Sequence, residues 1–268
     1  MNVNNLLNFL ELHFPSRFAM KDDKFGLEVQ TGTLEINNLL VCYEINEQVI
    51  EEAVGMNCQL ILTYHPFIYF PISRLYSTER MGKLLTLIIR NGISVVSLHT
   101  RFDTYKYGSN YILAKALGLE IDSFLEENNE DAEFGMGIIG HFSNKISTKT
   151  FLEKVYGVTK SVLKYTEGNS KYISKVGIVA GSGKEFINQA IAKELDAFIS
   201  ADISYHYFHS ANDRLWLIDA GHWETEQFIA AAITEFLKRN LDINSINIIQ
   251  SQINTNPIKY FGILNIEN

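Results

Sequence analysis

Apolar residues along this chain form two alternating patterns. Short apolar runs with β-branched and aromatic members predict buried strands at residues 39–43, 60–63, 93–98, 136–142, 162–165, 176–180, 197–200, 215–218 and 246–249. Apolar residues with the spacing of one helix face predict helices at residues 3–14, 47–54, 77–91, 110–117, 148–156, 185–195, 205–211 and 224–239. Because most of the strands are apolar on both faces, the alternation predicts an α/β fold of mostly parallel sheets flanked by helices.

One stretch interrupts this rhythm. Residues 125–132 are rich in Glu and Asn and have no apolar period, which predicts a linker or mobile loop. The portions on either side share the alternating plan, and 268 residues are enough for two domains of ordinary size. We therefore expect two related α/β units, at residues 1–124 and 134–268, joined by a linker at residues 125–133.

Composition narrows the class of protein. A net charge of −8 argues against a general nucleic-acid binder, because such proteins carry a basic face, but it leaves room for a small anionic substrate. The two cysteines, Cys42 and Cys58, have no metal-binding spacing and indicate a reduced, cytoplasmic setting. The N-terminal residues lack a signal-peptide pattern, and no apolar run is as long as a membrane span. We expect a soluble cytoplasmic protein without a membrane partner.

Candidate metal ligands follow several of the predicted strands. They are His65, His99 with Asp103, Asp202 with His206, and His222 with Glu226. In an open α/β sheet, ligands bind beyond the carboxyl ends of the strands. His222 and Glu226 are four residues apart at the start of a helix, so both side chains lie on one face and could share a divalent ion. The mixed nitrogen and oxygen set suits Zn, Mn, Fe or Mg, and the metal identity stays open. The alternative is that these side chains cap helices and fasten turns.

A glycine-rich turn, Gly181-Ser182-Gly183-Lys184, is not a phosphate-binding loop. That motif needs a glycine six residues before the lysine and a Ser or Thr after it, and the chain has Ile178 and Glu185 there. We expect these glycines to form a tight turn between a strand and a helix.

Several motifs together resemble the Nif-three-like dinuclear metal-centre family, also known as GTP cyclohydrolase I type 2 homologues. The family patterns D-N-V-G-L, S-H-H-P and H-T-N-x-D…G-x-N correspond to residues 23–27, 63–67 and 99–110 of this chain. Residues 179–183, 199–202 and 219–226 continue the resemblance. The motifs occur in the right order over nearly the whole chain, which makes the resemblance specific.

The resemblance implies one or two adjacent divalent ions. It identifies His65, Asp103, His222 and Glu226 as ligands, with Glu226 bridging, and implies a site at strand ends between the two units. Tyr64 stands where the family has a further histidine. Because a neutral phenol is a poor ligand, one ion site should be weakened or completed by water or tyrosinate. Arg101 replaces the asparagine of the H-T-N motif, and either binds a substrate phosphate or pairs with a surface carboxylate.

The resemblance also implies a function. We expect a metal-dependent hydrolase that acts on a nucleotide or another phosphate-containing substrate through a metal-activated water. Glu226 and His222 are the candidate catalytic residues, and His99, Arg101 and His206 are candidate substrate-binding residues. The alternative is a non-enzymatic metal-binding scaffold or regulatory interaction protein, which the tyrosine at position 64 favours. Family members are similar in forming hexamers, so we expect a homohexamer.

Overall fold

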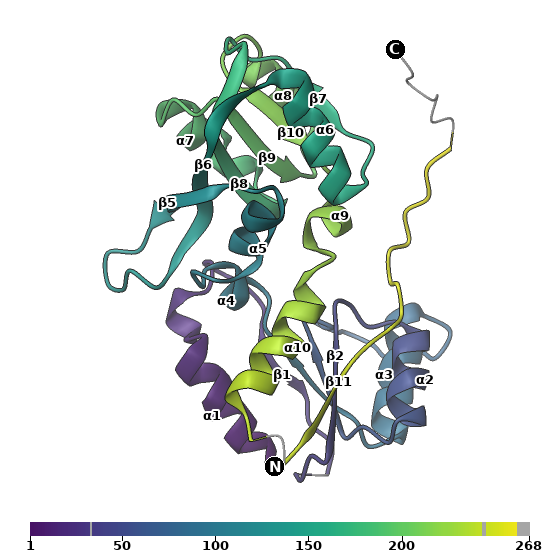
Figure 1. Ribbon diagram of the computed structural model, residues 1–268. Coiled ribbons are helices and arrows are strands. Elements are labelled where there is room, and N and C mark those ends of the chain that lie inside the picture. Colours follow the sequence, from purple (N-terminus) through teal and green to yellow (C-terminus); the bar gives the residue numbers. More distant parts are fainter. Residues whose placement is uncertain (33, 243–244, 262–268) are drawn as a thin grey trace. The chain divides into compact units, whose positions relative to one another are not determined.

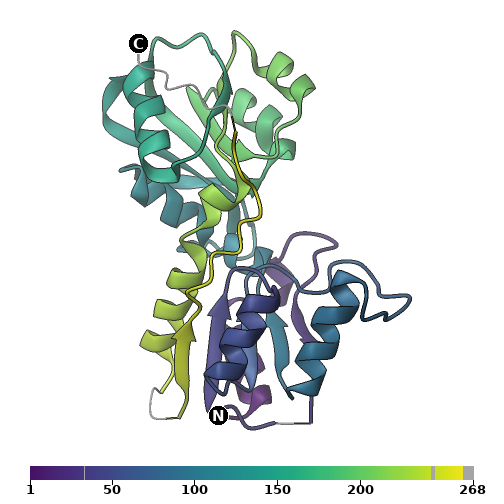
Figure 2. The same cartoon turned by 90° about the vertical axis from the view of Figure 1, so that its right-hand side faces the viewer.

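The computed structural model describes residues 1–32, 34–242 and 245–261 (Figures 1 and 2). The chain forms two compact units. The first consists of Met1–Thr104 and Ile229–Thr255, and the second consists of Tyr105–Phe228 and the described residues from Asn256 onward. No helix within the described residues is long and apolar enough to cross a membrane.

The first unit contains a five-stranded sheet in the order β1-β4-β3-β2-β11. The strands are β1 (Gly26–Val29), β2 (Asn38–Cys42), β3 (Leu60–Thr63), β4 (Ser94–Ser97) and β11 (Asn247–Gln250). The helices are α1 (Val3–His13), the short 3-10 helix η1 (Ser16–Phe18), α2 (Glu47–Gly55), α3 (Arg80–Arg90), α4 (Thr100–Asp103) and α10 (Ile229–Asn240). Only β1 is antiparallel to its neighbour, so this sheet is mostly parallel, as predicted.

Helices cover both faces of this sheet, which explains why its central strands β3 and β4 are buried throughout (Figure 1). Leu40, Ile61 and Val95 pack against buried residues of α2 and α3, which lie side by side in Figure 2. On the other side, α10 contacts β2 and β11, and the rings of Phe14 and Phe236 tie the end of α1 to α10 with centroids 4.8 Å apart.

The second unit contains a six-stranded sheet in the order β5-β6-β8-β9-β10-β7. The strands are β5 (Glu120–Glu127), β6 (Gly135–Ser147), β7 (Lys164–Thr166), β8 (Tyr172–Ser182), β9 (Ala197–Ala201) and β10 (Trp216–Asp219). The helices are α5 (Ser109–Ala116), α6 (Thr148–Thr159), the 3-10 helix η2 (Lys184–Phe186), α7 (Ile187–Ala192), α8 (Tyr205–Ala211) and α9 (His222–Glu226). Only β8, β9 and β10 are parallel to one another, whereas the other three pairings are antiparallel. The expectation of a mostly parallel second sheet is therefore corrected to a mixed one.

An apolar core lies between one face of this second sheet and helices α5 and α6. Leu113 of α5 and Phe151 of α6 pack with Ile178 and Ile199 of the sheet. The core residues of the strands recur at every second position, as side chains on one face of a sheet do, and Val179, Phe198 and Leu217 on the alternate positions are buried as well. At the carboxyl ends of the central parallel strands β8 and β10 the chain turns into η2 and α9, so this edge of the sheet carries the candidate residues of the second unit.

The two units differ from the expected division into residues 1–124, 125–133 and 134–268. Helix α5 and strand β5 belong to the second unit, and α10 and β11 return to the first. Ile248 of β11 pairs with Leu39 of β2, a contact between distant segments that leaves no local trace in the sequence. Within the expected linker, residues 125–127 belong to β5, and Leu125 is fully buried.

The helix predicted at residues 224–239 is two helices. Helix α9 ends at Glu226 and α10 begins at Ile229, so Gln227 and Phe228 separate them. The boundary between the two units lies directly after Phe228. Apolar periodicity continues across this break, which is why the pattern alone predicted one helix.

Candidate metal centre

In the first unit, four predicted residues lie at the carboxyl ends of β3 and β4. Tyr64 and His65 follow β3, and the parallel neighbour β4 leads to His99 and to Asp103 at the end of α4. The ring of His65 lies 5.0 Å from that of Tyr64 and 5.7 Å from that of His99, centroid to centroid. The parallel pairing of β3 and β4 thus collects these side chains, as the sequence predicted.

The Tyr64 phenol is engaged with one of the predicted ligands. Its hydroxyl donates a hydrogen bond of 2.8 Å to Oδ1 of Asp103, and both side chains are buried. The phenol therefore occupies one acceptor site of a carboxylate that would otherwise be available to a cation. His65 contacts Glu44, with 3.9 Å between Nδ1 and Oε2.

His99 is held in an unusual backbone conformation. Its φ is +45°, in the left-handed region that non-glycine residues rarely adopt. Its Nδ1 is hydrogen-bonded to Asp23, which also accepts a hydrogen bond from the hydroxyl of Thr100. Burial alone would raise the pKa of the Asp23 carboxyl, but its contacts with His99 and Thr100 lower the pKa below the usual value. A carboxylate thus fixes this imidazole, and its predicted role in substrate binding stays a prediction.

Arg101 lies within the first unit, in contact with α1. Its guanidinium donates to the carbonyl oxygens of Phe14 and Leu10 and forms an ion pair of 2.8 Å with Glu11. The side chain is only 6% exposed. The sequence left two roles open for Arg101, and this ion pair with Glu11 corresponds to the second, pairing with a surface carboxylate. The substrate role of Arg101 stays a prediction.

In the second unit, His222 and Glu226 come together on α9. Nε2 of His222 lies 3.1 Å from Oε2 of Glu226, one helical turn away. Nδ1 of His222 lies 2.6 Å from Oδ2 of Asp202, which follows β9. A carboxylate on Nδ1 orients an imidazole so that Nε2 can face a metal ion, which is the usual arrangement of histidine ligands. This His/Glu pair could hold a metal ion.

Two glycines with positive φ make room for the acidic side chains of α9. At Gly181, where φ is +64°, a Cβ would lie 2.2 Å from Oε1 of Glu226 and 3.2 Å from Nε2 of His222. At Gly221, where φ is +82°, a Cβ would lie 2.2 Å from Oε2 of Glu224. Position 181 therefore accepts no larger residue without displacing the candidate ligands. The glycine turn expected after the strand is thus also the wall of the site.

Neighbouring side chains fix this wall. The amide of Gly181 donates to the hydroxyl of Thr225 over 3.0 Å. The amide of Ala180 donates to the side-chain oxygen of Asn110 over 2.8 Å. Asn110 comes from α5 and belongs to the motif that begins at His99. That motif therefore supplies His99 and Asp103 in the first unit and a structural hydrogen bond in the second.

The electrostatics of α9 favour a positive charge at His222. Burial alone would lower the pKa of His222, but the negative charges of Glu226 and Asp202 and their hydrogen bonds outweigh burial and raise the pKa to about 11. The hydrogen bond from His222 likewise lowers the pKa of Asp202, against a smaller opposing effect of burial. The same carboxylates that favour a proton here would favour a cation.

Other predicted residues lie apart from this pair. His206 is exposed on α8, where its ring contacts Tyr205. Asp202, which the sequence placed beside His206, instead binds His222. The sequence patterns did not predict the supporting roles of Asp23 and Gly181. Asp23 is the first residue of the D-N-V-G-L-like motif, which was the available signal for it.

The comparison with known families decides the family of the chain. Residues 1–257 match the family model of Duf34/NIF3 (NGG1p interacting factor 3). The chain belongs to the DUF34/NIF3 family. The predicted resemblance is thereby confirmed.

Similar proteins and solved structures match this chain over almost its full length. A Clostridium acetobutylicum protein named GTP cyclohydrolase 1 type 2 homolog is 30% identical, over 97% of this chain and 99% of its own. A crystal structure of a Staphylococcus aureus hypothetical protein has a TM-score of 0.89 at 22% identity, covering 97% of this chain and 99% of that one. A Bacillus cereus protein related to NIF3 has a TM-score of 0.88 at 20% identity, with the same coverage. The mixed α/β fold with two helix-flanked sheets is thus a family feature.

Proposed function

We propose that the protein is a divalent-metal-dependent hydrolase that acts on a nucleotide or another phosphate-containing substrate. The observation that carries the proposal is the His222–Glu226 pair, which is oriented by Asp202 and faces a glycine that leaves it room. The relatives' name, GTP cyclohydrolase 1 type 2 homolog, supports hydrolysis of a nucleotide. The proposed ligands are His65, Asp103, His222 and Glu226.

The donor set fits such an ion. Two imidazoles and two carboxylates suit Zn, Mn, Fe or Mg, and the ion would supply Lewis acidity to the reaction. His222 is preorganised because Asp202 holds its Nδ1, and Glu226 is preorganised because its oxygens lie beside His222 and Gly181. A Glu226 oxygen would take a proton from the substrate water, whereas His222, with Nδ1 on Asp202 and Nε2 toward the ion, would act by holding that ion in place.

A second candidate function has its own observation. Tyr64 donates to Asp103 where the family has a histidine, which reduces the number of strong ligands. A protein with one weakly held ion would suit a non-enzymatic scaffold or regulatory interaction protein. We also propose that the protein is a homohexamer, as the resemblance implies.

Metal content and turnover test the proposal together. The wild type, purified without chelator, should contain at least one divalent ion per chain by elemental analysis and should turn over GTP. Glu226→Gln keeps the size of the side chain but removes its charge. It should lower turnover by about 100-fold or more and lower the metal content in parallel. Glu235→Gln is the matched control, because Glu235 is an exposed residue of α10.

The two functions predict different results. Loss of metal and turnover together in Glu226→Gln, with an unchanged control, supports the hydrolase. A wild type that holds metal but turns over neither GTP nor other phosphate compounds would favour the scaffold. A wild type free of metal and of turnover would refute the hydrolase.

A further inference from the structure

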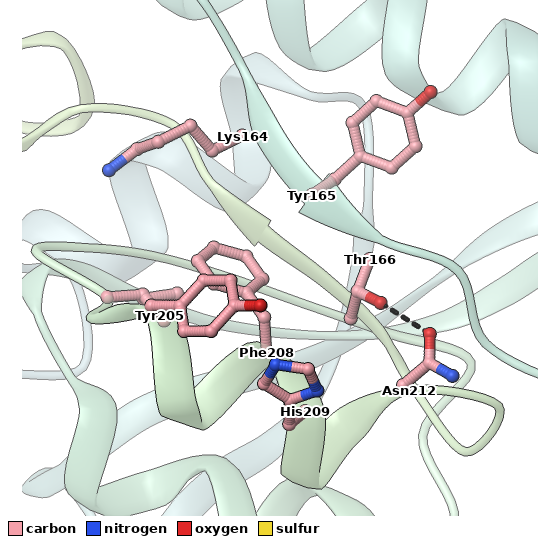
Figure 3. Close-up of a pocket in the computed structure, with 8 residues that line it drawn as sticks. Lys164, Tyr165, Thr166, Tyr205, Phe208, His209 and Asn212 are labelled. Atoms are coloured by element: carbon pink, nitrogen blue, oxygen red, sulfur yellow. Dashed lines mark hydrogen bonds between the residues drawn. The ribbon is translucent and has the colours of Figure 1, made fainter.

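A pocket in the second unit lies apart from the proposed ligands, between strand β7 and helix α8 (Figure 3). Its cavity volume is about 500 Å³. Small-molecule sites commonly have volumes of about 300–1,000 Å³, so the pocket has the size of a ligand site.

Aromatic rings of α8 form the floor of this pocket. Tyr205, Phe208 and His209 are spaced by three and four residues, so they lie on one face of the helix. The rings of Tyr205 and His209 lie 4.7 Å apart, edge to face. Tyr205 is 71% exposed, which leaves its ring surface open. Such a surface suits the flat face of an aromatic ligand.

The two ends of the pocket are polar and differ in charge. Lys164 and Thr166 alternate with Tyr165 along β7, and Tyr165 projects from the strand in another direction than Thr166 (Figure 3). The ring of Tyr165 stacks on that of Trp216. At one end, Thr166 donates to the side-chain oxygen of Asn212 over 2.8 Å. The hydroxyl oxygen of Thr166 can still accept a hydrogen bond from the edge of a heteroaromatic ring, and the remaining amide hydrogen of Asn212 can still donate one to it.

Lys164 supplies a cation at the other end. Its ammonium group lies 2.6 Å from Oδ2 of Asp219, and its side chain is 63% exposed. An ammonium group has three N–H donors, so two remain for a bound anion. Asp213 contacts the Thr166–Asn212 end through Asn212 and makes it less favourable for an anion, so an anionic group fits the lysine end better.

The pocket is connected to the α9 turn by Asp219. This buried carboxylate accepts hydrogen bonds from the amides of Ile203, which lines the pocket, and of Gly221, which precedes His222. Asp202, the partner of His222, is the residue before Ile203. A ligand in the pocket would therefore lie next to the segments that carry the His222–Glu226 pair.

We propose that this pocket binds the base of a purine nucleotide, with the ring on the Tyr205–Phe208 surface and the phosphate near Lys164. The chemistry it recognises is a flat heteroaromatic ring joined to an anion. The inference rests on the proposed function in taking a nucleotide as the ligand, and goes beyond it in assigning the base to a pocket outside the proposed metal ligands. Binding itself needs no metal, because no proposed ligand lines the pocket.

Calorimetric titration with GMP in the presence of chelator tests this inference separately from catalysis. The wild type should bind GMP, should bind guanosine more weakly and should not bind ribose 5-phosphate. Tyr205→Ala should weaken GMP binding by at least about 10-fold, because stacking on an aromatic side chain is lost. Lys164→Met should weaken GMP binding but leave guanosine binding unchanged. Tyr156→Ala is the matched control, since Tyr156 is an exposed ring on α6, outside the pocket.

Two further variants separate the pocket from the metal centre. His222→Ala should lose metal yet keep GMP affinity in chelator. If Lys164→Met folds poorly, Lys164→Arg is measured in its place. This variant preserves the charge beside Asp219 and should keep GMP binding. The inference is overturned if the wild type does not bind GMP in chelator, or if Tyr205→Ala binds it as tightly as the wild type does. Failure of turnover with intact GMP binding would reject the proposed hydrolase but not the pocket.

Discussion

At the scale of single residues, Tyr64 has the clearest consequence for the number of metal ions. Its hydroxyl donates to Asp103 and is buried, so it acts as a neutral hydrogen-bond donor to a proposed ligand. An imidazole at the same place would instead offer a lone pair to the ion.

Tyr64→His should therefore raise the metal stoichiometry, by up to about one ion per chain, because a second ion gains a strong nitrogen ligand. Elemental analysis of protein purified without chelator measures this ratio. Tyr64→Phe is the control, since it removes the hydroxyl without adding a ligand and should not raise the ratio. An unchanged ratio in Tyr64→His would mean that the native tyrosine already serves as the ligand or that this position does not face an ion.

At the scale of helices and strands, the sequence predicted most elements because their signals are local. Asn46 accepts a hydrogen bond from the amide of Val49 over 2.9 Å and starts α2, and residues 39–42 and 60–62 form apolar runs in the central strands of the first sheet. The antiparallel pairing of β5 with β6 was missed, because acidic residues interrupt the apolar pattern of β5. The candidate pair His222 and Glu226 was predictable from helical spacing, whereas the role of Asp202 depends on a loop after a different strand.

The contact between α4 and α1 allows a test of Arg101. Its guanidinium satisfies carbonyl oxygens at the end of α1, at Leu10 and Phe14. Arg101→Met should lower the free energy of unfolding by about 3 kcal/mol, because buried carbonyl groups lose their donor. Urea unfolding followed by circular dichroism measures the change.

Arg74→Met is the control for this variant. The Arg74–Glu79 ion pair is exposed, so its loss should change the free energy of unfolding by less than about 1 kcal/mol. If Arg101 only ties α4 to α1, GMP affinity should stay at the wild-type value. Unchanged stability together with weaker nucleotide binding would instead assign Arg101 to the substrate, as the sequence suggested.

At the scale of the whole molecule, the chain passes between its two units three times, after Thr104, Phe228 and Thr255. The sequence predicted two α/β units but not this exchange of segments. A strand such as β11 shows only its own apolar run, and nothing local tells that it will join a sheet made by the first hundred residues. Long-range pairing of this kind is decided by burial against the sheet, not by local propensity.

An exposed apolar segment makes the proposed hexamer testable. Between β3 and α3, five large apolar residues lie exposed, namely Tyr69, Phe70, Ile72, Leu75 and Tyr76. Exposed large apolar side chains that gather in one segment are typical of protein–protein contacts. We expect a second copy of the chain to cover it, so light scattering after size-exclusion chromatography should give about six times the chain mass of 30.5 kDa.

Phe70→Asp, which places a charge on a side chain that is 76% exposed, should lower that mass while leaving the far-UV circular dichroism unchanged. Tyr156→Asp on α6 is the control and should keep the wild-type mass, whereas a monomeric wild type would refute the hexamer and a hexameric Phe70→Asp would place the contact elsewhere.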